Sequence, residues 1–159
     1  MAKTLNASSA ALAESVELIT FRSNGLLLGI DILHVKEINC HLRHTPVPFS
    51  AGDVCGVINL RGEVLTVIDL ARLLRLSSNG HEGEPRYVIV ASDKERIALL
   101  VDAIEDVLTF ERSEFKPVPA NFRGIPKEAV SGIYPVAEDL LIVLDVDGAL
   151  NLKDELATA

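Results

Sequence analysis

The sequence predicts a mainly β protein whose strands form a closed or nearly closed arrangement. Three observations lead to this class. Four segments read as β-hairpins at regular spacing, the stretches between them show little helical pattern, and the apolar residues are mostly Val, Ile and Leu. Hydrophobic residues make up 48% of the 159 residues while aromatic residues make up 4% and Trp is absent, so we expect an aliphatic core.

Each hairpin is predicted from two apolar runs around a polar turn. The first turn is Asn24-Gly25, a pair that tolerates the positive φ angles of a tight turn. The second turn is Arg61-Gly62, which sets a charged tip between two runs so apolar that we expect both of their faces to be covered. The expected strands, in chain order, are Leu18–Arg22 with Leu26–Ile30, Val57–Leu60 with Val64–Ile68, Tyr87–Ala91 with Arg96–Val101, and the runs on either side of Ala137–Asp139.

An aspartate follows a strand and precedes an apolar stretch four times. Asp is a good N-cap, so each of these residues is expected to start a short helical turn. Asp102 and Glu105 also have the spacing of a capping box. The alternative is that the aspartates only end the strands. The four positions are Asp31, Asp69, Asp102 and Asp145 (or Asp147).

The recurrence suggests two similar halves. The polar stretch 77–86, with two Gly and a Pro, is the expected break between them. We expect a mobile tail at 1–15, one domain over 16–150, and a short C-terminal helix that frays over 151–159. In the proline-rich loop 115–126, Phe115 and Phe122 are expected either to pack on the body or to lie at an interface.

The charge and the cysteines exclude several classes of protein. The net charge is −8 without a basic cluster, which argues against nucleic acid and against an anionic membrane surface. Cys40 and Cys55 do not make a disulfide framework and are expected as small buried side chains. Neither a signal peptide nor an apolar run of about 20 residues is visible, so we expect a cytoplasmic protein.

No catalytic, cofactor or metal template fits the chain. It has neither a phosphate-binding glycine motif nor a nucleophile elbow. Cys40-His41-x-x-His44 is the nearest approach to a metal cluster but lacks a second half, and Asp145–Gly148 does not complete a calcium loop. We therefore expect no enzyme, no cofactor and no metal. What remains is a binding module, whose aliphatic groove is suited to an amphipathic helix.

The hairpin at residues 56–70 resembles the CheW family of chemotaxis coupling proteins. "GVINLRG", followed by an apolar strand and "IDL", carries the resemblance. "LLGIDILHVKEI", "IALLVDAIEDVL" and "VSGIYPVAEDLLIVLDVDGAL" extend it, in order, from about Leu18 to Leu150. The resemblance implies two SH3-like five-stranded β-barrels packed together, with short helical turns and a C-terminal helix, and no catalysis.

The resemblance also implies partners. Such proteins link transmembrane chemoreceptors to a CheA-type histidine kinase, and so lie peripheral to the inner membrane in receptor arrays. The receptor's helical tip would occupy the groove between the barrels, and the kinase's regulatory domain would meet the barrel ends. The matching receptor-side positions are Val35, Glu37, Gly56, Arg61, Ile104 and Val107. Kinase-side positions are a guess at Arg43, Val47 and Phe49.

The expected roles of the receptor-side residues each have a structural alternative. Val35, Ile104 and Val107 would form apolar groove wall, or would simply pack in the core. Gly56 would allow a close backbone approach. Glu37 and Arg61 would pair, with Arg61 making a bidentate contact, either to meet a partner or only to hold the hairpin tip.

Three other functions stay open. One is a CheW-like scaffold of a pathway that controls pili or a second messenger. Another is a component of the kinase ring that does not bind receptor. The third, from a different class, is a ligand-sensing domain with a small-molecule pocket between the barrels. The sequence argues against this last one, because few polar groups converge.

Overall fold

The computed structural model describes residues 14–48, 52–76, 84–93 and 95–158, and within these it contains two five-stranded sheets. The first sheet has the order β8-β1-β2-β10-β9, and the second has the order β3-β6-β7-β5-β4. The strands are β1 (Ser15–Ser23), β2 (Leu26–Asp31), β3 (Val35–Asn39), β4 (Val54–Leu60), β5 (Glu63–Asp69), β6 (Arg86–Ala91), β7 (Arg96–Val101), β8 (Ala103–Glu111), β9 (Val130–Val136) and β10 (Asp139–Leu144). The helical segments are η1 (Ile32–His34), α2 (Leu70–Leu73), η2 (Arg112–Glu114), η3 (Lys127–Ala129) and α3 (Val146–Thr158).

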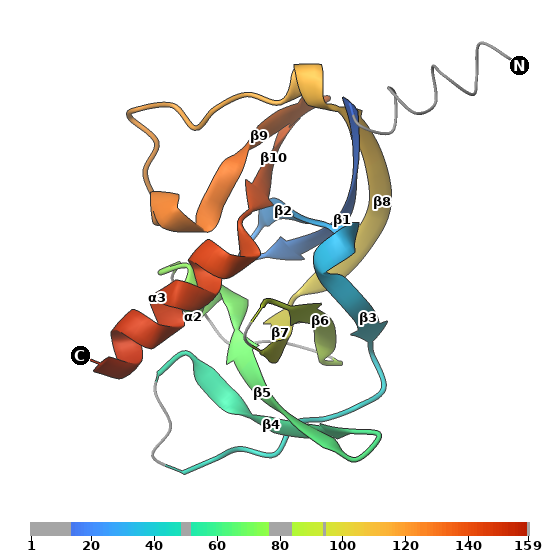
Figure 1. Cartoon of the computed structure of the whole chain (residues 1–159), viewed down its shortest axis with the longest axis vertical. Helices are drawn as coiled ribbons and strands as arrows, with labels where there is room; N and C mark the ends of the chain where they lie inside the picture. The colour runs from blue at the N-terminus through green and yellow to red at the C-terminus, as the bar shows by residue number, and fades with distance from the viewer. Residues whose placement is uncertain (1–13, 49–51, 77–83, 94, 159) are drawn as a thin grey trace, which may run out of the picture.

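The sheets are stacked along the long axis of the molecule, the first above the second in Figure 1, with α3 beside their junction. A short bridge after each edge strand brings the chain back to the opposite edge of the same sheet. Thr45, after β3, pairs with Val57 of β4, and Lys116, after β8, pairs with Ile133 of β9. The expected mainly β fold with two five-stranded units is confirmed.

The chain does not complete one sheet before it starts the other. It leaves the first sheet after β2, builds all of the second from β3 to β7, and returns with β8. The predicted break at 77–86 is therefore wrong, because β5 and β6, which flank it, belong to the same sheet. The parallel pairing of β2 with β10 accompanies this interleaving, since parallel strands need a long connection and here the connection contains the whole second sheet. Residues 77–83 lie outside the described part.

All four predicted hairpins are present. Asn24 and Gly25 have φ angles of 53° and 81°, and Arg61 and Gly62 have φ angles of 51° and 91°, as a tight turn between twisted strands requires. The side-chain oxygen of Asn59 accepts a 2.8 Å hydrogen bond from the Gly62 N–H and so fixes the second turn. The expectation of fully covered strands fails at Val64, which is 64% exposed.

Three of the four aspartates cap a helical turn. Asp31 accepts from the Leu33 N–H at 3.0 Å, Asp69 from the Ala71 N–H at 3.0 Å, and Asp145 from the Gly148 N–H at 3.0 Å. The predicted helix after Asp102 is wrong, because β8 begins at the next residue. The Asp102 carboxylate instead accepts from the Asn24 N–H at 2.8 Å, in the first hairpin turn.

The largest core cluster lies between the two sheets. Phe21 and Leu28 of the first sheet meet Val88 and Leu99 of the second, and Leu150 of α3 joins them. A smaller cluster lies within each sheet. The members are aliphatic apart from a few aromatic residues, as the composition predicts. Burial of the largest cluster stabilises the contact between the two sheets, by roughly 25 cal/mol for each Å² of apolar surface removed from water.

The proline-rich loop 115–126 packs on the body of the molecule through its two phenylalanines, and the C-terminal helix is longer than predicted. Phe115 packs against Tyr134 with ring centroids 5.2 Å apart, and Phe122 packs on the central cluster, so both phenylalanines pack on the body. Residues 151–158, expected as a frayed tail, continue α3. Of the expected tail at 1–15, residues 1–13 lie outside the described part, and Ser15 begins β1. Cys40 and Cys55 are half-buried free thiols rather than buried ones.

Candidate functional site

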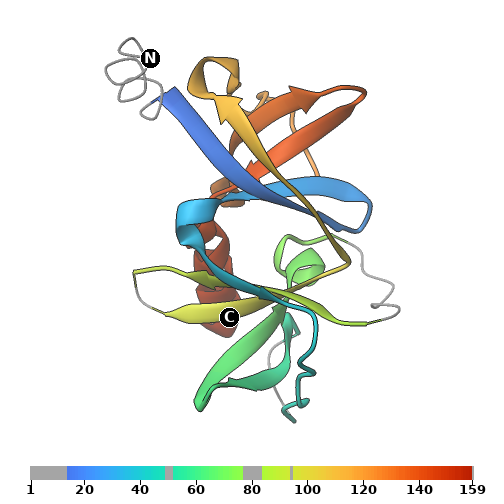
Figure 2. The same cartoon turned by 90° about the vertical axis from the view of Figure 1, so that its right-hand side faces the viewer.

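The strands β3 and β8 carry the three predicted apolar site residues on one side of the molecule, which faces the viewer in Figure 2. Val35 lies opposite Val90, Ile104 opposite Phe21, and Val107 opposite Ile19. Residues directly opposite in antiparallel strands point to the same face. Because Val90, Phe21 and Ile19 all belong to the cluster between the sheets, the three predicted residues share the face that the sheets turn toward each other.

Their burial differs along this face. Val35 and Ile104 are half-buried against the central cluster, whereas Val107 is 50% exposed. Leu33 of η1, two residues before Val35, is 80% exposed. The core-packing alternative therefore describes part of the role of Val35 and Ile104. Val107 and Leu33 are apolar side chains without full cover, and sequence reasoning missed Leu33 because a three-residue helix has no periodicity to read.

Glu37 and Arg61 form the predicted ion pair. Arg61 Nη1 donates to Glu37 Oε1 at 2.9 Å, and Nη2 donates to the same oxygen. The pair is therefore not a fork across two oxygens, as the bidentate prediction required. The Arg61 side chain is 69% exposed against 25% for Glu37, so the pair is worth about 0–1 kcal/mol. The contact ties the hairpin tip to β3 and leaves most of the guanidinium facing solvent.

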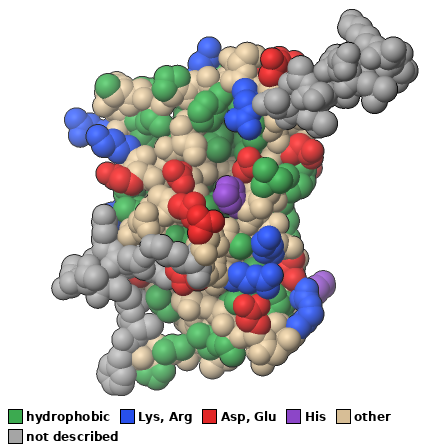
Figure 3. All heavy atoms as spheres, in the orientation of Figure 1, with side chains coloured by type: hydrophobic (Ala, Val, Ile, Leu, Met, Phe, Trp, Pro, Cys, Tyr) green, Lys and Arg blue, Asp and Glu red, His purple; other side chains and the backbone are tan. Residues whose placement is uncertain are grey.

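A polar cleft of about 400 Å³ surrounds this pair. Its floor includes Leu60 and Ile89 of the second sheet. A second ion pair, Arg96 Nη1 to Glu63 Oε1 at 3.0 Å, lies in the same cleft. Figure 3 shows basic and acidic side chains intermixed over the second sheet. The cleft thus presents two neighbouring, exposed arginine–glutamate pairs.

Gly56 is held in close contact with the chain's own backbone. Its φ is +156°, and a Cβ there would lie 2.1 Å from the Thr45 carbonyl oxygen and 3.0 Å from the Cα of Pro46. Thr45 and Val57 exchange two backbone hydrogen bonds of 2.8 and 2.9 Å beside it. The close approach expected at Gly56 is therefore made by the segment that returns to β4.

The guessed kinase-side residues lie on the same returning segment. Arg43 Nη2 pairs with Glu84 at 2.8 Å, with both side chains largely exposed. Val47 is exposed, and Phe49 lies outside the described residues. The exposed pair and the exposed valine are compatible with a contact surface, and their role stays a prediction.

Arg22, near the turn of the first hairpin, forms two ion pairs with other strands of the first sheet. Its Nε lies 2.7 Å from Glu105 and its Nη2 lies 2.9 Å from Asp139. Hydrogen bonds to these two carboxylates raise the pKa of Arg22. The Leu140 N–H and then Arg22 hold the pKa of Asp139 below its usual value. One side chain thereby links β1, β8 and β10.

The described residues contain no group of three or more His, Cys, Asp or Glu side chains placed to hold a metal ion. His44 Nδ1 lies 2.9 Å from the Tyr87 hydroxyl. Burial raises the pKa of the Cys55 thiol to about 11, which disfavours a reactive thiolate. None of the helices in the described part has the length and apolar character that a membrane crossing requires.

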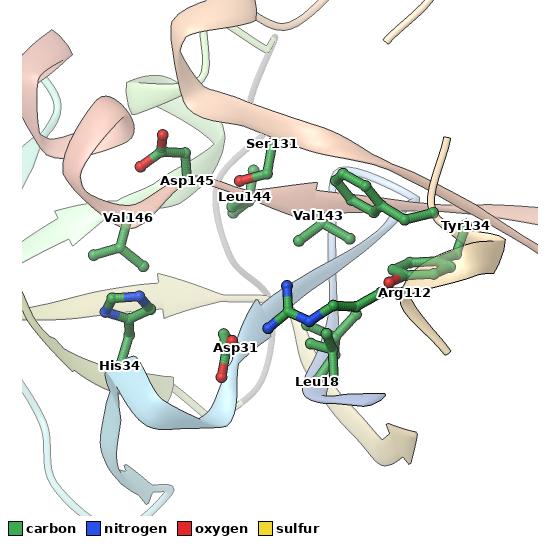
Figure 4. Close-up of a pocket in the computed structure, with 12 residues that line it drawn as sticks. Leu18, Asp31, His34, Arg112, Ser131, Tyr134, Val143, Leu144, Asp145 and Val146 are labelled. Carbon is green, nitrogen blue, oxygen red and sulfur yellow. The ribbon is translucent and has the colours of Figure 1, made fainter. Parts of the chain in front are cut away.

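A cavity of about 310 Å³ opens at the first sheet, where sequence reasoning placed nothing. Figure 4 shows its polar lining, which includes Asp31, Arg112 and Asp145 around apolar side chains of the sheet. The sequence marks Asp31 and Asp145 only as aspartates that end a strand, and nothing in it indicates that they and Arg112 surround one cavity. The cavity contains none of the six predicted receptor-side residues.

Two small β units, a partly exposed apolar face between them and exposed ion pairs define a protein-binding module. The CheW-like domain family matches residues 17–154, so the chain belongs to that family. It is 34% identical over 143 residues to "Chemotaxis protein CheW" of Rhizobium meliloti (strain 1021), covering 89% of this chain and 91% of the relative. It is 32% identical over 135 residues to "Chemotaxis protein CheW" of Bacillus subtilis (strain 168), covering 85% and 86%.

A solved structure shares the fold. The scaffolding protein TtCheW from Thermoanaerobacter tengcongensis superposes with a TM-score of 0.75 at 27% identity, covering 82% of this chain and 88% of that one. The two five-stranded sheets are therefore the SH3-like subdomains that the resemblance implied.

Proposed function

We propose that the chain is a non-enzymatic chemotaxis adaptor that couples transmembrane chemoreceptors to a CheA-type histidine kinase. The observation that carries the proposal is the match of residues 17–154 to the CheW-like domain family. The curated relatives that bear the name of a chemotaxis protein match over most of their length as well as most of this chain. Residues 16–150 act in this proposal as one functional unit in the cytoplasm, held near the inner membrane by the receptors.

The receptor's helical tip lies, in this proposal, along the apolar face of β3 and β8. Val107 supplies exposed apolar surface there, and Val35 and Ile104 supply the half-buried floor. An amphipathic helix presents side chains at i, i+3, i+4 and i+7 to such a face. Arg61 adds a charge-assisted contact beyond this face, on the side of β3 where Glu37 lies opposite Ile89, because its guanidinium carries donors beyond those that Glu37 uses. Gly56 contributes indirectly, by letting the Thr45 segment close the second sheet.

The kinase's regulatory domain meets the ends of the subdomains, and Arg43, Val47 and Phe49 are the proposed contacts. Support comes from the exposure of Arg43 and Val47 on a segment away from the β3–β8 face. The same arrangement serves a flagellar pathway or one that controls pili or a second messenger, since the adaptor's chemistry does not depend on the output.

The test measures receptor and kinase binding separately on the full chain, by isothermal titration with a receptor-tip fragment and with the kinase regulatory domain. Val107→Glu is expected to weaken receptor binding about tenfold or more, because it places a charge in an apolar contact. Val64→Glu is the matched control, since Val64 is also exposed but lies on the second hairpin. Equal receptor affinity for the two variants would contradict the proposed face.

Arg61→Ala is expected to weaken receptor binding while leaving the fold intact. Arg96→Ala is its control, because Arg96 forms a similar exposed pair with Glu63 in the same cleft. Unchanged binding by a folded Arg61→Ala chain would remove Arg61 from the contact. Binding of kinase without any binding of receptor would instead identify a kinase-ring component.

A further inference from the structure

The cavity at the first sheet has the make-up of a small-ligand site. Its volume of about 310 Å³ lies at the low end of the range for ligand pockets, roughly 300–1,000 Å³. Its lining mixes apolar surface with a few convergent polar groups, which is the usual composition of such pockets. Its lining residues come mainly from β1, β2, β9 and β10, from the end of η1 and from the starts of η2 and α3.

The polar groups of opposite charge come from different walls. Figure 4 shows Asp145 on one side of the cavity and the guanidinium of Arg112 extending into it from another, with Tyr134 beside Arg112. Ser131 lies on the same side as Asp145. The buried apolar side chains Val143 and Val146 also line the cavity.

The Asp145 carboxylate has capacity left for a ligand. Its Oδ1 accepts from the Gly148 N–H at 3.0 Å, and its other oxygen has no hydrogen bond or ion pair with any described residue. Asp31 is similar, since Oδ1 accepts from the Leu33 N–H at 3.0 Å and Oδ2 has no described partner. A carboxylate has about four acceptor sites and an arginine has five N–H donors, so each group can bind a ligand beside its existing contact.

From this geometry we propose that the cavity binds a small zwitterion of amino-acid size with an apolar body. The ligand's ammonium group lies against Asp145 and the Ser131 hydroxyl. Its carboxylate lies against Arg112 and the Tyr134 hydroxyl. Its apolar body covers Val143 and Val146.

Charge selects a zwitterion over a simple ion. An anion would meet Arg112 but also two carboxylates, Asp31 and Asp145, whose like charge repels it. A simple amine would satisfy a carboxylate but leave the guanidinium facing its apolar part. A ligand with both charges pairs with the carboxylate on one wall and with the guanidinium on the other, and the apolar floor favours an apolar body. The inference is independent of the proposed adaptor function, because no proposed receptor or kinase contact lines the cavity.

The test titrates the full chain with L-leucine and follows backbone amide shifts by NMR. We expect saturable binding with a Kd on the order of 1 mM, as for a ligand of this size. The amides of Ser131, Tyr134 and Val146 should shift. 3-Methylbutylamine and 4-methylpentanoate, which are leucine without its carboxylate and without its ammonium group, should each bind at least about fivefold more weakly.

Asp145→Asn removes the charge but keeps the oxygen that caps α3, so the variant should fold normally and lose affinity at least about fivefold. Glu138→Gln, at the exposed tip of the β9–β10 hairpin, is the control and should bind as the parent does. The absence of saturable shifts at about 20 mM leucine would overturn the proposal. So would shifts confined to residues outside the cavity, undiminished binding by Asp145→Asn, or an analogue that binds as tightly as leucine.

Discussion

Replacement of Gly56 by alanine tests how the second sheet is closed. A Cβ at this position would lie 2.1 Å from the Thr45 carbonyl oxygen and 2.7 Å from its carbon, and both are backbone atoms that cannot rotate away. The returning segment must move to make room. That movement breaks the two backbone hydrogen bonds between Thr45 and Val57, which measure 2.8 and 2.9 Å.

The expected loss of stability follows from these two effects. Two hydrogen bonds at about 0.5–1.5 kcal/mol each contribute about 1–3 kcal/mol. The φ of +156° lies in a region that residues with a side chain rarely occupy, which adds about 1–3 kcal/mol. The free energy of unfolding should therefore fall by about 2–6 kcal/mol, a large part of the roughly 5–15 kcal/mol typical of a domain.

Equilibrium urea denaturation measures this loss, with Gly25→Ala as the matched control. Gly25 also has a positive φ, +81°, but a Cβ there meets nothing within 4 Å, so its cost is backbone strain alone. Hydrogen exchange of the Thr45 and Val57 amides should accelerate in Gly56→Ala only. If Gly56→Ala is no less stable than Gly25→Ala, the account of the closing segment is wrong.

Three further predictions follow from the structure. In a Cys40→Ser variant, Cys55 should react with a thiol reagent at about pH 8 some two orders of magnitude more slowly than free cysteine, because burial raises its pKa to about 11. A rate near that of free cysteine would refute the burial argument. Asp69→Ala should lower the free energy of unfolding by about 1–2 kcal/mol in urea denaturation, since the Ala71 N–H loses its 3.0 Å acceptor, whereas Asp69→Asn should retain most of the stability. The pKa of Asp139 in the folded chain lies below its unfolded value, so the ionised side chain stabilises the fold above the ordinary carboxyl pKa, and this stabilisation is lost as the pH falls through the folded pKa. In thermal melts, the melting temperature of Asp139→Asn should therefore fall less on acidification than that of the parent. An identical fall for both proteins would contradict this.

Local features of the fold were predictable because local chemistry determines them. The Asn24-Gly25 turn adopts the positive φ angles that this pair tolerates, and Gly62 does so in the second hairpin. The cap at Asp69 likewise depends on neighbours two and three residues away. The same reasoning failed at Asp102, because its partner is the Asn24 N–H, 78 residues distant along the chain.

Neither the order of the strands nor the cavity could be predicted from the sequence, because both depend on contacts between distant parts of the chain. Nothing in β2 indicates that its parallel neighbour is β10, so the two halves looked sequential although they interleave. The receptor-side candidates came from family resemblance. The structure brings Val35, Ile104 and Val107 onto one face, but the exposure of Leu33 beside them depends on the angle at which η1 joins β2 to β3.

The most direct test of the adaptor proposal is whether one molecule holds receptor and kinase together. Receptor-tip fragment is fixed to beads, and the kinase regulatory domain is added with and without the full chain. The account predicts that kinase is retained only when the chain is present, and that Val107→Glu abolishes its retention while the separate affinity for kinase is unchanged. Kinase retained equally without the chain, or displacement of the chain from receptor when kinase binds, would contradict it.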